Sequence, residues 1–158
     1  MAGNVKPVPD GFHSVTPYLV VDGAADAIDF YTRALGASEL FRMPDPSGKI
    51  AHAEIQVGDS RILLSDEFPE RGEMGGKSPK TLSGSAVSIF IYTEDVDALF
   101  NRAVTAGATV KLPPTDMFWG DRWSHVVDPF GHEWQFATHV EDLTPEQMGE
   151  RAAAAMGG

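Results

Sequence analysis

The sequence contains no cysteine, which excludes disulfide bridges, thiol catalysis and thiolate metal sites. It also has no apolar run near the ~20 residues that a membrane-spanning helix needs. The opening stretch, MAGNVKPVPDGFH, lacks the apolar core of a signal peptide, so a cytoplasmic location is the default expectation. We therefore expect a chain that acts away from membranes.

Positive charge is scarce: 12 Lys and Arg against 23 Asp and Glu give a formal net charge of −11. This balance argues against nucleic acid and anionic membranes as partners, and it suits either solubility or the binding of cationic ligands. No serine, histidine and acid occur in a nucleophile-elbow context, and no glycine-rich loop precedes a helix as a phosphate site requires. The 158 residues, 42% of them hydrophobic, are enough for one domain, or for one domain built from two halves.

The segment 119–139, WGDRWSHVVDPFGHEWQFATH, predicts two strands joined by a tight turn. Side chains alternate on both sides of the break at 128–131 with the period of two that is typical of a strand. Asp-Pro-Phe-Gly is a turn sequence, since proline fixes φ and glycine supplies conformational freedom. The alternation places Gln135 on one face of the hairpin and Trp134 on the other, where Trp134 would pack under a helix. Because this hairpin combines tryptophan, histidine, arginine and glutamine, we expect a functional site on it.

The two halves of the chain follow one pattern: a strand, a helix and three more strands. In the first half, the helix is predicted at 24–35 with Asp22 as its N-cap. Its strands are predicted at 12–21, 39–43, 49–57 and 61–65. In the second half, Asp95 is the predicted cap of a helix that ends at Gly107. The strands there are predicted at 86–92 and 109–112, followed by a break at Pro113-Pro114 and then by the hairpin.

This repetition predicts an α+β fold of two βαβββ units. One helix covers only one face of a four-stranded sheet, so two units can curl their free faces into a curved mixed sheet around a shared cavity. The predicted divisions are an N-terminal arm, a first module, a connector, a second module and a C-terminal tail with a short helix. Their bounds are 1–11, 12–66, 67–84, 85–140 and 141–158. The connector region, Asp66 to Gly84, is rich in glycine, proline and mixed charge, so it is also a candidate lid, and its acids are expected to be solvated.

Two segments carry a resemblance to a known family: LVVDGAADAIDFYTRALGA at 19–37 and the hairpin at 119–139. They resemble the vicinal oxygen chelate superfamily, which includes glyoxalase I, the bleomycin-resistance proteins and the extradiol dioxygenases. KIAHAEIQVGDS, DEFPE and SPKTL are similar to its PhnB-like branch. The resemblance covers roughly residues 12–140. It implies the glyoxalase/bleomycin-resistance fold and a homodimer, with the connector spanning or bordering the interface. It does not identify the reaction, because one fold can carry many reactions.

The resemblance also implies where a divalent metal would be bound in enzymes of this superfamily. The family's ligand positions fall on Thr16, on Leu64 or Ser65, and on Ser88 and Gln135. Zinc and nickel sites need imidazole and carboxylate ligands, and none of these residues supplies either. We therefore expect no cofactor, and Thr16, Ser88 and Gln135 become candidate ligand-binding residues instead.

Other side chains could bind or react. Trp119 and Trp123 are candidates for an aromatic wall, and Arg122 could either bind a ligand anion or pair with Asp121. His52 and Glu54 share a strand face and could meet His125 or His132 across the cavity, as an atypical metal site or as acid–base groups.

Each histidine also has a structural interpretation, and two classes of function stay open. The first is a non-catalytic protein that binds a small planar or cationic compound. The second is an enzyme of the same superfamily, of lyase, isomerase or dioxygenase type, which uses an atypical metal site or metal-free acid–base residues.

Overall fold

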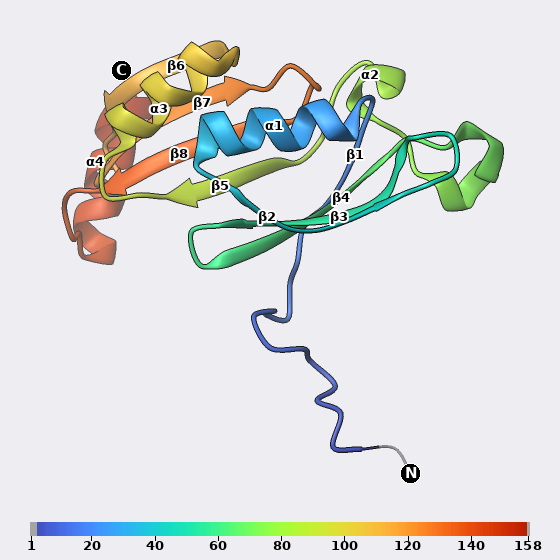
Figure 1. Cartoon of the computed structure of the whole chain (residues 1–158). Coiled ribbons are helices and arrows are strands. Elements are labelled where there is room, and N and C mark those ends of the chain that lie inside the picture. The colour runs from blue at the N-terminus through green and yellow to red at the C-terminus, as the bar shows by residue number, and fades with distance from the viewer. Residues whose placement is uncertain (1–2, 158) are drawn as a thin grey trace. The chain divides into compact units, whose positions relative to one another are not determined.

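The computed structural model describes residues 3–157 and divides into two compact units, Met1–Gly84 and Ser85–Gly158 (Figure 1). Each unit contains one four-stranded mixed sheet and a helix that packs on one face of it. The predicted α+β fold of two βαβββ units is therefore confirmed. No helix within residues 3–157 has the length and apolar character needed to cross a membrane.

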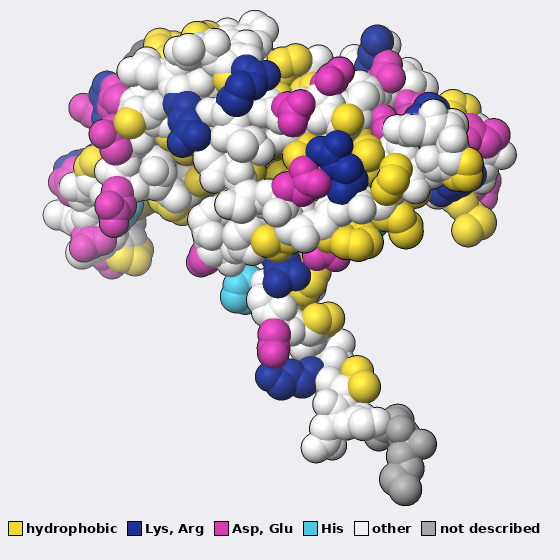
Figure 2. Space-filling model, in the orientation of Figure 1, with side chains coloured by type: hydrophobic (Ala, Val, Ile, Leu, Met, Phe, Trp, Pro, Cys, Tyr) yellow, Lys and Arg dark blue, Asp and Glu magenta, His cyan; other side chains and the backbone are white. Residues whose placement is uncertain are grey.

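In the first unit the strands lie in the order β1-β4-β3-β2, with β1 parallel to β4 and the other pairs antiparallel. The elements are β1 (Tyr18–Val21), α1 (Ala24–Leu35), β2 (Ser38–Pro44), β3 (Ile50–Val57) and β4 (Ser60–Asp66). Helix α1 buries Ala27, Ile28 and Tyr31, as its periodicity predicted, and it ends at Gly36, whose φ of 68° suits glycine. Figure 2 shows hydrophobic side chains along the β2–β3 margin, where Leu40 and Phe41 of edge strand β2 are exposed.

Two details of the first unit differ from the sequence prediction. The strand expected at 12–21 begins only at Tyr18. Pro17 has no N–H to donate to a ladder, and its carbonyl accepts the last sheet-like hydrogen bond, from the Leu63 amide at 2.9 Å. The N-cap of α1 is Gly23 rather than Asp22, and no side chain next to the helix caps it.

The cap of α1 comes from Asp66 at the end of β4. Its Oδ1 accepts hydrogen bonds from the amides of Gly23 and Ala24, at 2.9 and 2.8 Å, and its Oδ2 accepts one from the Ile50 amide at 2.7 Å. Asp66 is only 7% exposed. The expectation of a solvated acid at this position is therefore wrong: the carboxylate joins the helix, β3 and β4.

In the second unit the strand order is β5-β8-β7-β6, again with one parallel pair, β5 with β8. The elements are β5 (Ser88–Tyr92), α3 (Val96–Ala106), β6 (Thr109–Asp116), β7 (Asp121–Val127) and β8 (Glu133–His139). Asp95 caps α3 as predicted, because its side chain accepts from the Ala98 amide at 3.0 Å. The predicted break at Pro113-Pro114 is wrong: β6 runs through both prolines. It is an edge strand with a register shift at this point, where the missing N–H groups remove no hydrogen bond.

The predicted hairpin is confirmed as β7 and β8. Asp128 is buried in its turn, where Oδ1 accepts from the amides of Phe130 and His132, at 2.8 and 3.0 Å. Its Oδ2 accepts from the Trp134 indole at 2.8 Å. Trp134 is 1% exposed, as its place under the helix predicted. One carboxylate therefore fixes both the turn and the core tryptophan.

The segments outside the sheets also contain helices. Residues 67–84 include a 3₁₀ helix, η1 (Pro69–Gly75), and α2 (Pro79–Leu82), and the tail contains α4 (Pro145–Met156). Thr144 and Gln147 form a capping box at the start of α4. Of the predicted arm at 1–11 and tail at 141–158, residues 1–2 and 158 lie outside the described residues.

Candidate functional site

The sheet of the second unit has one face covered by α3 and one face with polar and aromatic side chains. Ser124, Val126 and Phe136 are buried on the covered side, together with Trp134. The opposite face, which we call the hairpin face, carries Ser88, Phe90, Trp123, His125 and Gln135. The alternation of β5, β7 and β8 produces this division, since successive residues of a strand point to opposite sides.

Three predicted ligand-binding residues are joined in one hydrogen-bonded chain on the hairpin face. The Trp123 indole donates to Oε1 of Gln135 at 2.9 Å, and Nε2 of Gln135 donates to Oγ of Ser88 at 2.6 Å. These bonds also fix the orientation of the amide, with its oxygen toward Trp123. These three hydrogen-bonded side chains carry no formal charge, so they hold the Trp123 indole ring in place without any ion.

A second group of aromatic side chains adjoins Trp123. The Trp119 ring lies 5.7 Å from the Trp123 ring in an edge-to-face arrangement. Its indole donates to Oδ2 of the buried Asp121 at 3.2 Å, and the same oxygen accepts from the Tyr92 hydroxyl at 3.0 Å. That hydrogen bond, with burial, raises the pKa of Tyr92. Phe90 lies 5.0 Å from Tyr92 and both rings are exposed.

Phe90 and Tyr92 are not among the site residues predicted from the sequence. Their alternation with Ser88 along one strand is the signal that could have found them, because Ser88, Phe90 and Tyr92 are separated by two residues each.

Arg122 is not on the hairpin face. Its Nε and Nη2 donate to the two carboxylate oxygens of Asp97 on α3, at 2.7 and 2.9 Å, and its Nη1 donates to Asp116 at 3.2 Å. The hydrogen bond from Arg122 lowers the pKa of Asp97, and the two carboxylates raise the pKa of Arg122. Arg122 therefore ties β7 to α3 and β6. Its partners are Asp97 and Asp116 rather than the sequence neighbour Asp121.

His125 lies on the hairpin face, with its ring 6.0 Å from that of Trp123. Its Nε2 is 3.7 Å from Oε1 of Glu133, beyond hydrogen-bond range, and it is buried without a hydrogen-bond partner among the described residues. Glu133 is held instead by Lys111, whose hydrogen bond is the main cause of its lowered pKa. His125 is thus placed beside the aromatic wall with one ring nitrogen unused.

In the first unit, a row of four polar side chains crosses the sheet face opposite α1. The Tyr18 hydroxyl is 3.0 Å from Nδ1 of His52, and Nε2 of His52 is 3.6 Å from Oε1 of Glu54. Nη1 of Arg61 donates to the other Glu54 oxygen at 3.3 Å. The predicted pair of His52 and Glu54 is thus extended at its two ends by Tyr18 and Arg61, which were not predicted as site residues.

Thr16 lies just before this row. It is half-buried and two residues ahead of Tyr18, outside β1.

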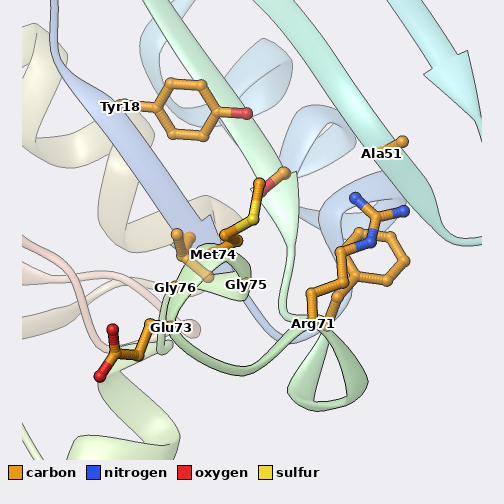
Figure 3. Close-up of a pocket in the computed structure, with 10 residues that line it drawn as sticks. Tyr18, Ala51, Arg71, Glu73, Met74, Gly75 and Gly76 are labelled. Atoms are coloured by element: carbon orange, nitrogen blue, oxygen red, sulfur yellow. The ribbon is translucent and has the colours of Figure 1, made fainter.

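A cavity of about 320 Å³ lies next to Tyr18, between β1, β4 and the η1 segment. Figure 3 shows the Tyr18 ring and the Arg71 guanidinium on opposite sides of the Met74 side chain, with Gly75 and Gly76 beneath them. The walls combine the apolar side chains of Val20, Ala51, Phe68 and Met74 with the hydroxyls of Tyr18 and Ser65 and with the charged groups of Arg71 and Glu73. Nothing in the sequence pattern indicated this cavity, because it forms where a loop folds back over a distant strand.

The residues at the metal positions implied by the family do not fit a divalent metal. Leu64 is buried and apolar, and Ser88 and Gln135 are hydrogen-bonded to each other. Hydroxyl and carboxamide oxygens are poor ligands for zinc or nickel. Among residues 3–157, no three His, Asp or Glu side chains gather in a way that could hold a metal ion.

The repeated order of strands and helices places the protein in a class of duplicated βαβββ proteins. A family model for the Glyoxalase/Bleomycin resistance protein/Dioxygenase superfamily matches residues 11–136. The chain therefore belongs to this superfamily.

Individual relatives support the same assignment. An uncharacterized protein of Mycobacterium tuberculosis (strain ATCC 25618 / H37Rv) is 43% identical over 150 residues, which are 94% of this chain and 84% of the relative. The crystal structure of TioX from Micromonospora sp. ML1 is similar, with a TM-score of 0.63 and 28% identity over 81% of this chain and 99% of TioX. A PhnB protein from Bacillus cereus shares the fold, with a TM-score of 0.61, 16% identity and coverage of 80% of this chain and 99% of that protein.

Proposed function

We propose that this protein binds a small planar or cationic compound on the hairpin face, and that it does so without the metal site usual in its superfamily. The observation that carries the proposal is the chain from Trp123 through Gln135 to Ser88. It fixes a half-buried indole ring on a sheet face, beside a second tryptophan at 5.7 Å. A flat ligand would find a wall whose orientation is already set, which reduces the entropy lost on binding.

The chemistry of this face supports a planar or cationic ligand. Aromatic pairs gain about 0.5–1.5 kcal/mol beyond area burial, and a cation over an indole ring gains about 0.5–2 kcal/mol. The net charge of −11 adds a field that attracts cations and repels anions. Both features are general, so they support a class of ligand rather than one compound.

The side chains at the family's ligand positions support binding without a metal. Gln135 uses its amide oxygen and its amide nitrogen for neighbouring side chains, and the Ser88 hydroxyl accepts from Gln135. A metal bound at these positions would have only neutral oxygen ligands, which have low affinity for zinc, nickel or iron.

The test is calorimetric titration with proflavine, a planar aromatic cation, beside tetrabutylammonium, a cation that is not planar. We expect proflavine to bind more tightly. Trp123→Ala should weaken proflavine binding by roughly two- to twelvefold, the equivalent of about 0.5–1.5 kcal/mol of stacking. Phe118→Ala is the matched control, because it truncates an aromatic ring that packs edge-to-face on Trp119 and is no member of the chain from Trp123 to Ser88. No saturable binding of either cation, or no effect of Trp123→Ala on proflavine binding, would refute the proposal.

Metal content is a separate test of the same proposal. The purified protein, prepared without chelators, should carry no stoichiometric zinc, nickel or iron in elemental analysis. About one metal per chain, lost on replacing His52 or Glu54, would overturn the metal-free proposal and favour an enzyme with an atypical site.

A second candidate function is metal-free acid–base catalysis in the first unit. The observation that favours it is the row from Tyr18 through His52 to Glu54, in which a carboxylate faces one ring nitrogen and a phenol faces the other. Such a row can orient an imidazole for proton transfer. If it acts in a lyase or isomerase reaction, His52→Gln should abolish turnover and leave proflavine binding unchanged. Loss of proflavine binding in His52→Gln would instead assign His52 to the binding site.

A further inference from the structure

The cavity between β1, β4 and η1 belongs to the first unit, whereas the hairpin face belongs to the second. It shares Tyr18 with the row of the second candidate function, but none of its other lining residues has a role in either proposed function. Among the residues that the structure describes, Arg71 is the one cation that lines this cavity. Four other arginines form ion pairs: Arg42, Arg61, Arg122 and Arg151. Arg71 forms no ion pair with any residue in 3–157. Arg71 is an exposed residue that also lines the cavity, so its guanidinium can be reached by a ligand from solvent.

The Arg71 guanidinium is held in place by an aromatic ring rather than by an acid. Its central carbon lies 4.0 Å from the centroid of the Phe68 ring, and Phe68 is 2% exposed. The Lys49 ammonium lies 5.1 Å from the same ring and donates to the Glu67 carbonyl. A guanidinium that stacks on a buried ring keeps its N–H groups free at the edges, which is the geometry that a planar anion needs.

The acids near Arg71 are engaged elsewhere or point away. Oδ1 of Asp45 accepts from the Ser47 hydroxyl, the Ser47 amide and the Lys49 amide. These bonds, the Ser47 hydroxyl first, lower the Asp45 pKa, and the charge of Arg71 contributes least. Glu73 lines the cavity, but Figure 3 shows its carboxylate directed away from the space between Tyr18 and Arg71.

The wall below the cavity is built by a close approach of the loop to the strand. A Cβ at Gly76 would lie 2.7 Å from Cγ2 of Val20, and one at Gly75 would lie 2.2 Å from the Phe68 carbonyl oxygen. Both distances are too short for a real side chain, and Gly76 has a φ of 60°. Glycine at 75 lets the end of η1 fold back on Phe68, and glycine at 76 lets the segment approach Val20 of β1.

We propose that this cavity binds a small organic carboxylate with an apolar body. The carboxylate would accept two hydrogen bonds from the Arg71 guanidinium, and the body would lie along Val20, Phe68 and Met74 toward the Tyr18 ring. A volume of about 320 Å³ lies at the lower end of the roughly 300–1,000 Å³ common for small-molecule sites, so a single-ring acid is the appropriate size. An anion meets general repulsion from this acidic protein, and a fixed, unpaired guanidinium is what would overcome it.

The test uses benzoate as the probe, with benzamide as its neutral isostere, on the full chain labelled with ¹³C in the methionine methyl groups. Benzoate should shift the Met74 methyl signal saturably, and benzamide should bind on the order of tenfold more weakly, because it lacks the charge-assisted pair. Benzamide binding as tight as benzoate, or a benzoate shift that leaves Met74 unchanged, would overturn the proposal.

Variants assign the effect to Arg71. Arg71→Gln should weaken benzoate on the order of tenfold or more, and Arg71→Lys should weaken it less, since the charge remains but the planar fork is lost. Arg42→Gln is the matched control: it removes the same charge from the same unit, at an arginine that is paired with Glu39. Equal loss in Arg42→Gln and Arg71→Gln would refute a specific site. An unchanged methionine methyl spectrum of Arg71→Gln without ligand shows that the fold is intact.

This test is separable from that of the proposed function. All three tryptophans, at positions 119, 123 and 134, lie in the second unit, so tryptophan fluorescence reports on the hairpin face and the Met74 methyl reports on the cavity. Loss of proflavine binding with benzoate binding intact would refute only the proposed function. The reverse result would refute only the carboxylate site.

Discussion

Replacement of Asp66 by alanine should destabilise the first unit far more than replacement of Asp22, although Asp22 directly precedes α1. Asp66 accepts three backbone hydrogen bonds while 7% exposed: two from the start of α1 and one from Ile50 in β3. Asp22 is exposed, and its carboxylate pairs only with the Lys80 ammonium, at 3.0 Å. The two substitutions remove the same charge, so they compare a buried cap with a surface ion pair.

The magnitude follows from the groups left without partners. Loss of a helix N-cap costs about 0.5–2 kcal/mol, and a buried amide without an acceptor, here that of Ile50, costs about 1–3 kcal/mol. Asp66→Ala should therefore lower the free energy of unfolding by about 2–5 kcal/mol. Asp66→Asn retains one oxygen but turns an NH₂ group toward a backbone donor, so it should lie at the lower end of that range. Asp22→Ala should cost about 0–1 kcal/mol, as exposed ion pairs do.

The assay is urea denaturation followed by far-UV circular dichroism, because all three tryptophans lie in the second unit and the first contains none. Hydrogen exchange at the amides of Ala24 and Ile50 localises the effect, since both should exchange faster in Asp66→Ala and keep their protection in Asp22→Ala. If Asp22→Ala proves as destabilising as Asp66→Ala, or if Asp66→Ala costs less than about 1 kcal/mol, the long-range cap does not hold the unit together.

Three further outcomes are expected. Trp134→Ala should lower stability by about 3–5 kcal/mol, because it removes a buried ring and leaves Asp128 without its indole donor; a loss of ligand binding with unchanged urea stability would show that the hairpin faces the other way. Hydrogen bonds to Asp121 first and then to Asp142 raise the pKa of His139 above its ordinary 6.5. The stability that His139 contributes is therefore fully present below its pKa in the unfolded chain and is lost as pH rises through its higher pKa in the folded protein. The urea midpoint should fall with rising pH in the wild type and vary less in His139→Asn. We also expect a homodimer, because the apolar side chains of edge strand β2 are exposed; a monomer in light scattering at micromolar concentration would contradict it.

Periodicity and turn chemistry in the sequence were sufficient for the order of the sheet strands and of helices α1 and α3, and for the faces of the hairpin. Helix α1 has the predicted bounds, Ala24–Leu35, and Trp134 lies in the core on the side opposite Gln135. These features depend on local conformation: a strand alternates every two residues, and a glycine stops a helix wherever it adopts a positive φ. The duplication of the pattern also led to the family, which the match over residues 11–136 confirms.

The tertiary structure decided which polar groups meet. The sequence suggested Asp22 as a cap and Asp121 as a partner for Arg122, since both are close along the chain. The sheet instead brings Asp66 to α1 from 42 residues away, and it brings Arg122 to Asp97 on α3. Neither pairing has a local signal, because each depends on strand order and on how a helix lies across the sheet.

The same reason explains why the cavity beside Tyr18 could not be predicted. The segment 66–84 has no periodicity, so the sequence indicated only a connector. Gly75 lets this segment fold back on Phe68, and Gly76 lets it approach Val20 of β1, which brings Met74 and Arg71 to the cavity beside Tyr18. The sequence by itself therefore determined the strands of the two sheets, the helices α1 and α3, their faces and the family of this protein. Only the tertiary structure determined its helix cap, its ion pairs and its cavity, because these depend on groups that are distant in sequence and adjacent in space.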